Sequence, residues 1–141
     1  MGLRTLCLCY NAPMSAGDIL IVEDDAVLRN LYIKKFSVEG FTIRTAQNGE
    51  EALQEIQKQK PDVLILDIHM PVLDGFQVME KLPKQERTYP VIMLTNFADD
   101  TTKARAQELG ADDYFVKKDM TIRTLLEMVH RVMNLKKYGN K

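Results

Sequence analysis

The feature that most constrains the fold is an apolar run, residues 63–66, that ends directly in Asp67. Pro61 precedes this run, and a loop containing proline and glycine follows it. A short apolar run between such breakers is typical of a strand that is buried on both faces, as in a parallel sheet. Open α/β sheets build their sites at the carboxyl ends of strands. Asp67 is therefore predicted to lie in a site, as a ligand or as a nucleophile.

From residue 18 onward, strand patterns alternate with helical patterns. Strands are predicted at residues 19–22, 41–45, 63–67, 91–94 and 114–116. Helices are predicted at residues 26–39, 50–60, 76–82, 100–109 and 121–136. Five β-α units with nearly continuous apolar strands predict an α/β fold, a doubly wound five-stranded parallel sheet covered by five helices. The pattern does not determine the order of the strands.

Capping residues mark where two of these helices begin. Asp25 is predicted to cap the first helix and Asp74 the third, and Gly40 is predicted to stop the first. Apolar residues of the first helix recur at helical spacing, which predicts its buried face. These residues are Val27, Leu28, Leu31, Tyr32 and Phe36.

The length of 141 residues suits one domain, predicted to span residues 18–137. Residues 1–17 are interpreted as a flexible leader or a mis-assigned start, and residues 138–141 as a frayed end. The net charge of −1 favours neither nucleic acid nor anionic lipid as a partner. No apolar stretch approaches the about 20 residues of a membrane span. Cys7 and Cys9 lack the second pair of ligands that a zinc site needs. They do not suggest a disulfide framework either, so a reducing cytoplasm is the expected location.

Polar residues follow four of the predicted strands. They are Glu23-Asp24-Asp25, Asp67, Thr95 and Lys117. In a parallel sheet these strand ends face the same way, so carboxylates, a hydroxyl and an ammonium are expected to converge. Clustered carboxylates repel one another, and a hard divalent cation such as Mg²⁺ relieves the repulsion. The ammonium and the hydroxyl would stabilise a phosphoryl group in transfer, with Asp67 accepting it as an acyl phosphate.

Four motifs in order resemble the receiver domain of two-component response regulators. The motifs are residues 22–25 (VEDD), 67–75 (DIHMPVLDG), 94–95 (LT) and 114–117 (YFVK). Each lies at a predicted strand end, and the resemblance covers essentially residues 18–135. It implies a flavodoxin-like fold with strand order 2-1-3-4-5.

The resemblance implies a magnesium site around the acceptor. Asp67 would be both phosphoacceptor and metal ligand, and Asp24 a direct ligand. Glu23 would act on the metal through water, and His69 would supply only its backbone carbonyl.

The resemblance also implies a switch. Lys117 and Thr95 would stabilise the phosphoryl group, and Thr95 would turn towards it. Tyr114 would change rotamer together with Thr95. Phosphorylation would then remodel the surface near the last helices.

Three positions depart from the family pattern or vary within it. Asn96 stands where a small residue is usual, and could narrow access for small phosphodonors. Lys118 stands where proline is usual, often after a cis bond, which is rare before other residues. His69 is at a variable position that could tune dephosphorylation.

The expected partners are a sensor histidine kinase or a phosphotransfer protein, a downstream effector protein, and a second copy in a possible phosphorylation-dependent homodimer. No enzyme activity is expected beyond phosphorylation and dephosphorylation of Asp67 itself. The effector is expected to bind the fourth helix, fifth strand and fifth helix. Basic residues expected on this surface are Lys103, Arg105, Arg123 and Arg131.

Two alternatives remain at this point. A Mg²⁺-dependent aspartyl phosphatase would resemble D-x-D, but His69 stands where the second acid belongs. A degenerate receiver would be a constitutive interaction module. Four intact site residues argue against the degenerate receiver, namely Asp24, Asp67, Thr95 and Lys117. The unusual residues at 96 and 118 keep it open.

Overall fold

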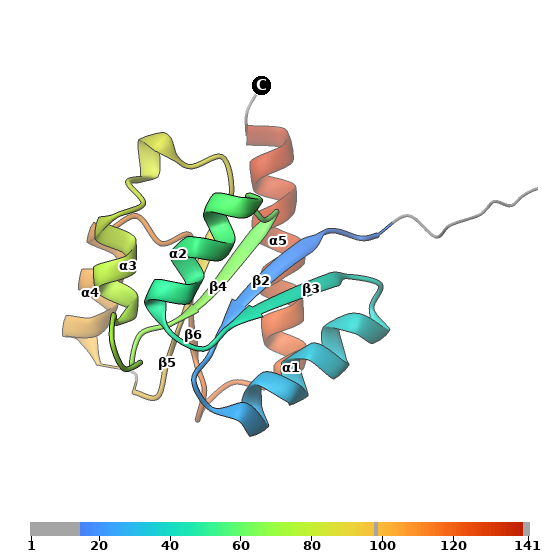
Figure 1. Cartoon of the computed structure of the whole chain (residues 1–141), viewed down its shortest axis with the longest axis horizontal. Coiled ribbons are helices and arrows are strands. Elements are labelled where there is room, and N and C mark those ends of the chain that lie inside the picture. The colour runs from blue at the N-terminus through green and yellow to red at the C-terminus, as the bar shows by residue number, and fades with distance from the viewer. Residues whose placement is uncertain (1–14, 98, 140–141) are drawn as a thin grey trace, which may run out of the picture.

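The computed structural model describes residues 15–97 and 99–139, which form a parallel sheet between two layers of helices (Figure 1). The strands are β2 (Asp18–Val22), β3 (Thr42–Ala46), β4 (Val63–Asp67), β5 (Val91–Thr95) and β6 (Asp113–Val116). Their order is β3-β2-β4-β5-β6, and every neighbouring pair is parallel. Counted along the chain, this order is 2-1-3-4-5. The predicted fold class is confirmed.

The helices are α1 (Ala26–Val38), α2 (Gly49–Lys58), α3 (Gly75–Glu80), α4 (Asp100–Glu108) and α5 (Ile122–Gly139), with a short 3₁₀ helix η1 (Lys84–Glu86) that was not predicted. Helices α1 and α5 cover one face of the sheet, and α2, α3 and α4 cover the other (Figure 1). The predicted caps are present. The Asp25 carboxylate accepts hydrogen bonds from two amides of α1, and Asp74 forms a reciprocal capping box with Gln77.

The predicted leader and the C-terminal residues fall largely outside the described residues, which include only 15–17 of the leader. Those three residues lie beside the start of β3, where the Ala16 amide donates a hydrogen bond to the Gly40 carbonyl at 3.0 Å. The predicted domain limits therefore stay a prediction.

Two hydrophobic cores lie on opposite faces of the sheet, because successive residues of a strand point to opposite sides. Ile19 and Ile21 of β2 pack with α1 and α5, whereas Leu20 and Val22 pack with the other helices. All five residues of β4 are buried. This confirms the strand buried on both faces that the run before Asp67 predicted.

The predicted inner face of α1 is wrong at two positions. Tyr32 and Phe36 are buried and Leu28 is partly buried, but Val27 is 77% exposed and Leu31 is 41% exposed. At 3.6 residues per turn, Val27 and Leu31 share a stripe that points away from Phe36. The five apolar residues therefore form two stripes on different sides of α1, and the sequence prediction treated them as one buried face.

Gly75, the first residue of α3, allows this helix to begin directly against the end of β4. A Cβ atom at this position would lie 2.5 Å from the backbone oxygen of Asp67 and 2.8 Å from Cα of Ile68. The Gly75 amide instead donates a hydrogen bond to the Ile68 carbonyl at 2.9 Å. The absence of a side chain here helps to set the position of Asp67.

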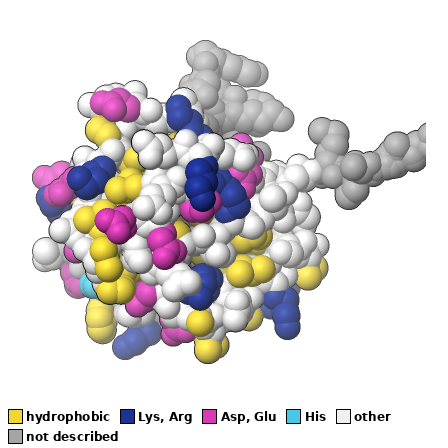
Figure 2. All heavy atoms as spheres, in the orientation of Figure 1, with side chains coloured by type: hydrophobic (Ala, Val, Ile, Leu, Met, Phe, Trp, Pro, Cys, Tyr) yellow, Lys and Arg dark blue, Asp and Glu magenta, His cyan; other side chains and the backbone are white. Residues whose placement is uncertain are grey.

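Charged side chains of both signs are interspersed on the face of the molecule shown in Figure 2. This mixture agrees with the nearly balanced composition, 19 basic and 20 acidic residues. Among the described residues, no helix combines the length and apolar character that crossing a membrane requires.

Gly75→Ala is expected to lower the free energy of unfolding by about 3 kcal/mol, because the new methyl group would meet backbone that cannot move aside. Urea denaturation measures this loss. Gly40→Ala is the matched control. Gly40 has φ of +94°, and a Cβ there would make only an ordinary contact, with Ala16 Cβ at 3.9 Å, so that variant should lose only about 1 kcal/mol from backbone strain. Equal losses in the two variants would contradict the role of Gly75.

Candidate functional site

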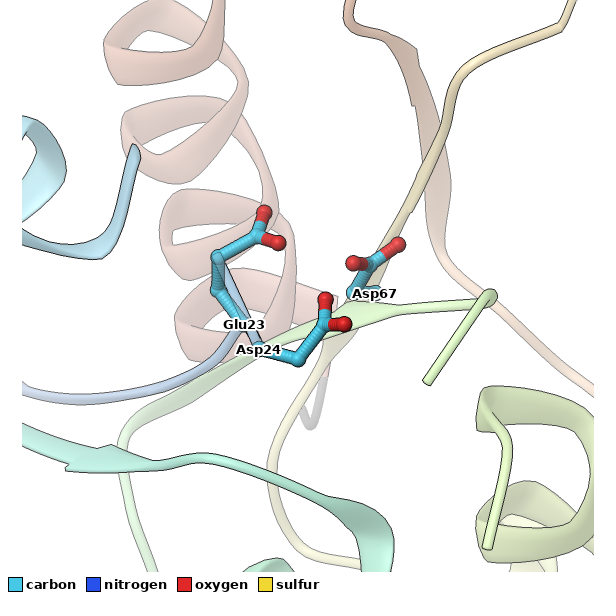
Figure 3. A group of neighbouring side chains, drawn as sticks. All are labelled: Glu23, Asp24 and Asp67. Atoms are coloured by element: carbon cyan, nitrogen blue, oxygen red, sulfur yellow. The ribbon is translucent and has the colours of Figure 1, made fainter. Parts of the chain in front are cut away.

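Three carboxylates gather at the carboxyl edge of the sheet. Glu23 and Asp24 follow β2 directly, and Asp67 is the last residue of the neighbouring strand β4. One oxygen of each lies within 4.8 Å of one oxygen of the others, and the three side chains are drawn in Figure 3. Glu23 and Asp67 are buried, whereas Asp24 is exposed. We call these three residues the acidic cluster.

Lys117, the residue after β6, places its ammonium between the two buried carboxylates. Its Nζ lies 2.7 Å from Oε1 of Glu23 and 3.1 Å from Oδ2 of Asp67. The Lys117 side chain is only 10% exposed. Its backbone is fixed as well, because the Lys117 amide donates a hydrogen bond to the Thr95 carbonyl at 2.8 Å.

Burial and mutual repulsion perturb the ionisation of these groups. Burial, followed by interaction with Asp67, raises the pKa of Glu23 to about 7 despite the nearby ammonium. Burial also raises the pKa of Asp67, although Glu23 and Lys117 oppose this effect. Burial alone would lower the pKa of Lys117, but its hydrogen bond to Glu23 and the two carboxylate charges outweigh burial and raise it. One ammonium thus faces two buried carboxylates, and negative charge is in excess.

Hydrogen bonds orient the acidic cluster. Nη1 of Arg29 in α1 donates to the Glu23 carbonyl at 2.8 Å. The Asp25 amide donates to Oε2 of Glu23, and the His69 amide donates to Oδ1 of Asp67, both at 3.3 Å. The sequence analysis missed Arg29, because a basic residue in the first turns of a helix is usually solvated.

The donor set of the acidic cluster fits a hard divalent cation. It offers only carboxylate oxygens, it carries excess negative charge, and Asp24 gives it an open side. Oε1 of Glu23 is buried, and the Lys117 ammonium contacts it as an ion pair at 2.7 Å. The acidic cluster is therefore consistent with Mg²⁺. The individual ligands expected from the sequence stay predictions.

Thr95 and Tyr114 both contact Phe97, a residue that the sequence analysis did not single out. The buried Thr95 hydroxyl accepts a hydrogen bond from the Phe97 amide at 3.2 Å and lies 3.3 Å from the Phe97 carbonyl, to which it can donate. The Tyr114 hydroxyl donates to the same carbonyl at 3.1 Å. One weak feature of the sequence could have pointed to Phe97, namely an aromatic residue in a loop two positions after Thr95.

The three positions that depart from the family pattern or vary within it lie in the loops at this same edge. His69 and Lys118 are exposed, and Asn96 is half-buried. The described residues contain no cis peptide bond, so the chain passes through Lys117 and Lys118 in the trans form.

Two of the basic residues expected to bind an effector are engaged within the molecule. Arg105 of α4 pairs with Glu80 at 2.8 Å and with Glu108 at 3.3 Å. Arg131 of α5 pairs with Asp113 at 3.2 Å. The other two, Lys103 and Arg123, are exposed. A groove runs along α4, β6 and α5, and both Lys103 and Tyr114 line it.

Comparisons with known proteins agree with this geometry. A family profile of the response regulator receiver domain matches residues 19–130. The probable transcriptional regulator ycf27 of Guillardia theta is 44% identical over 99 residues, which cover 70% of this chain and 39% of that protein. The alkaline phosphatase synthesis transcriptional regulatory protein PhoP of Bacillus subtilis is 38% identical over 99 residues, covering 70% of this chain and 41% of that protein.

Solved structures share the fold. A response regulator receiver domain protein (CheY-like) from Methanospirillum hungatei has a TM-score of 0.81 and 26% identity, covering 89% of this chain and 99% of that one. The two curated regulators are longer, and this chain spans about two fifths of their length.

Mg²⁺ affinity is expected to fall by up to about tenfold as the pH drops from 8 to 6. Protonation of Glu23, whose pKa is about 7, removes one negative charge from the acidic cluster over this range. Titration calorimetry at the two pH values measures the change. Glu23→Gln should bind Mg²⁺ more weakly and should lose most of the pH dependence. A wild-type affinity that is the same at pH 6 and pH 8 would contradict this account.

Proposed function

The chain belongs to the response regulator receiver family, and we propose on this basis that it is a phosphorylation-activated switch of a two-component phosphorelay. A sensor histidine kinase or a phosphotransfer protein donates a phosphoryl group to Asp67 in the cytoplasm. The observation that carries the proposal is the buried Asp67 carboxylate, 3.1 Å from the Lys117 ammonium and inside the acidic cluster.

In the transfer step, a carboxylate oxygen of Asp67 attacks the phosphorus of the donor phosphohistidine. The oxygen–phosphorus bond forms, the phosphorus–nitrogen bond breaks, and the donor imidazole keeps the electron pair and takes up a proton. Lys117 pairs with the phosphoryl oxygens, because its ammonium already lies within reach of the acceptor. The product is an acyl phosphate, a mixed anhydride that water can hydrolyse.

Asp24, Asp67 and the backbone carbonyl of His69 would hold Mg²⁺, with Glu23 acting through water. The ion supplies neutralisation of charge on the phosphoryl group when it is bound. Glu23 would have a second role, because its carboxylate pairs with the same Lys117 ammonium as Asp67. It keeps Lys117 charged and directed at the site.

Thr95 and Tyr114 would transmit the new charge to the surface. For its hydroxyl to reach a phosphoryl oxygen, Thr95 must break its hydrogen bonds with the Phe97 backbone. The Phe97 carbonyl also accepts the hydrogen bond of the Tyr114 hydroxyl, so Tyr114 would respond to the change. Tyr114 also lines the groove of α4, β6 and α5. Movement of its ring therefore changes a surface that a partner can bind.

The partner at this surface would be a downstream effector or a second copy of the chain in a phosphorylation-dependent homodimer. Lys103 and Arg123 are exposed and form no ion pair with the described residues, so they could meet an acidic partner, whereas Arg105 and Arg131 must first leave intramolecular pairs. The named relatives are transcriptional regulators, so control of transcription is one output that this surface could serve.

Asp67→Asn is expected to abolish Mg²⁺-dependent uptake of beryllofluoride, a phosphoryl mimic, because the mimic bonds to a carboxylate oxygen that the amide lacks. Chemical-shift changes near Thr95 and Tyr114 report uptake. Asp119→Asn, the same change at an exposed position, should bind as wild type does. Uptake by Asp67→Asn would exclude the assignment of the acceptor. No uptake by wild type would favour a constitutive interaction module.

Thr95→Ala is expected to weaken beryllofluoride binding by about tenfold, since one hydrogen bond to a charged group is lost. At saturation, the resonances of Tyr114 should stay close to their resting positions. Thr101→Ala, at an exposed position of α4, is the control. A full shift of Tyr114 in Thr95→Ala would contradict the switch role of the hydroxyl.

A further inference from the structure

Side chains from three loops meet at the carboxyl edge of the sheet. His69 follows β4, Phe97 follows β5 and Lys118 follows β6, so each loop borders the acidic cluster or Lys117. The Phe97 ring lies close to both of the other side chains. Lys118 Nζ is 5.0 Å from the ring centroid, and the His69 ring stands edge-on with centroids 6.3 Å apart.

The contact between Lys118 and Phe97 is attractive, because an ammonium within about 6 Å of a ring centroid interacts with the negative face of the ring. Among the described residues, Lys118 has no ion pair that competes with this contact. Phe97 is 55% exposed, so burial in the core does not hold its ring in place. The contact is therefore a main restraint on the ring.

The backbone of Phe97 is held at the same time by the two residues of the switch. The Thr95 hydroxyl and the Phe97 backbone are joined by contacts at 3.2 and 3.3 Å, and the Tyr114 hydroxyl donates to the Phe97 carbonyl. Thr95 cannot turn towards Asp67 without breaking its contacts to Phe97. A restraint on the Phe97 ring is thus a restraint on Thr95.

We propose that Lys118 and Phe97 form a clasp that holds the Phe97 backbone against Thr95 in the resting state and opposes the rearrangement that follows phosphorylation. The inference rests on the proposed function, because it assigns these residues as positioning residues for the same switch. Breaking the clasp makes the active arrangement easier to reach, and so tightens the binding of any ligand that requires it.

Removing the charge of Lys118 gives a sharp test, because the clasp and a simple attraction of anions predict opposite changes in the affinity for a phosphoryl mimic. If Lys118 only attracted anions to the site, removing its charge would weaken the binding of a phosphoryl mimic. If it holds the clasp, Lys118→Met should tighten Mg²⁺-dependent beryllofluoride binding by about two- to fivefold, the factor expected for one exposed cation–π contact. Lys60→Met, the same change at an exposed residue before β4, is the control for charge.

Two further variants separate the clasp from a general structural effect. Lys118→Arg keeps the cation over the ring and should bind beryllofluoride as wild type does. Phe97→Leu keeps an apolar side chain but loses the ring, and should also tighten binding. Lys118→Met and Phe97→Leu remove the same contact, so the double variant should bind beryllofluoride little more tightly than either single variant.

NMR spectroscopy of the free protein tests the contact between Lys118 and the Phe97 ring directly. In the free protein the ring current of Phe97 should shift the Lys118 side-chain CH₂ protons upfield, and this shift should vanish on beryllofluoride binding and in Phe97→Leu. Weaker or unchanged binding by Lys118→Met relative to Lys60→Met would overturn the clasp. Failure of the proposed function would look different, since wild type itself would then take up no beryllofluoride.

Discussion

The interaction on which the structure of the site depends is the contact of one ammonium, Lys117, with two buried carboxylates, Glu23 and Asp67. Burying an unpaired carboxylate costs several kcal/mol, so neither acid would stay ionised at this edge without a cation. The three residues come from the ends of β2, β4 and β6. Only a parallel sheet with β2 and β4 adjacent brings these ends to one edge.

With one ammonium and three carboxylates, the site carries excess negative charge, and this excess favours the binding of a divalent cation. Burial raises the pKa of both buried acids, and interaction with Asp67 raises that of Glu23 further, so a cation at the acidic cluster would favour their ionised forms. The same imbalance makes added phosphoryl charge costly unless groups nearby reorganise. The groups placed to do so are Lys117 and the Thr95 hydroxyl, and Thr95 is tied to Phe97 and, through the Phe97 carbonyl, to Tyr114. In the proposed switch, these contacts would pass a change of charge at Asp67 to the loop at Phe97 and to the groove that Tyr114 lines.

The sequence predicted the strand before Asp67, the class of the sheet and the two helix caps, because each of these depends on neighbours in the chain. Strand order came from family resemblance, since apolar periodicity carries no information on pairing. Val27 of α1 was wrongly predicted to be buried, because helical spacing does not tell which side of a helix meets the sheet. Contacts made across loops were missed. The buried Arg87 guanidinium, for example, donates to the Leu82 and Gly110 carbonyls, and its partners are set only by the folded backbone.

The central claim is that the phosphoryl group is carried by Asp67, and mapping the acyl phosphate tests it most directly. Borohydride reduces an aspartyl phosphate to homoserine, which peptide mass spectrometry locates within the sequence. After phosphorylation in the presence of Mg²⁺, we predict homoserine at position 67, and its disappearance when Mg²⁺ is chelated beforehand. Homoserine at another aspartate, or none in protein that has incorporated phosphate, would contradict the account.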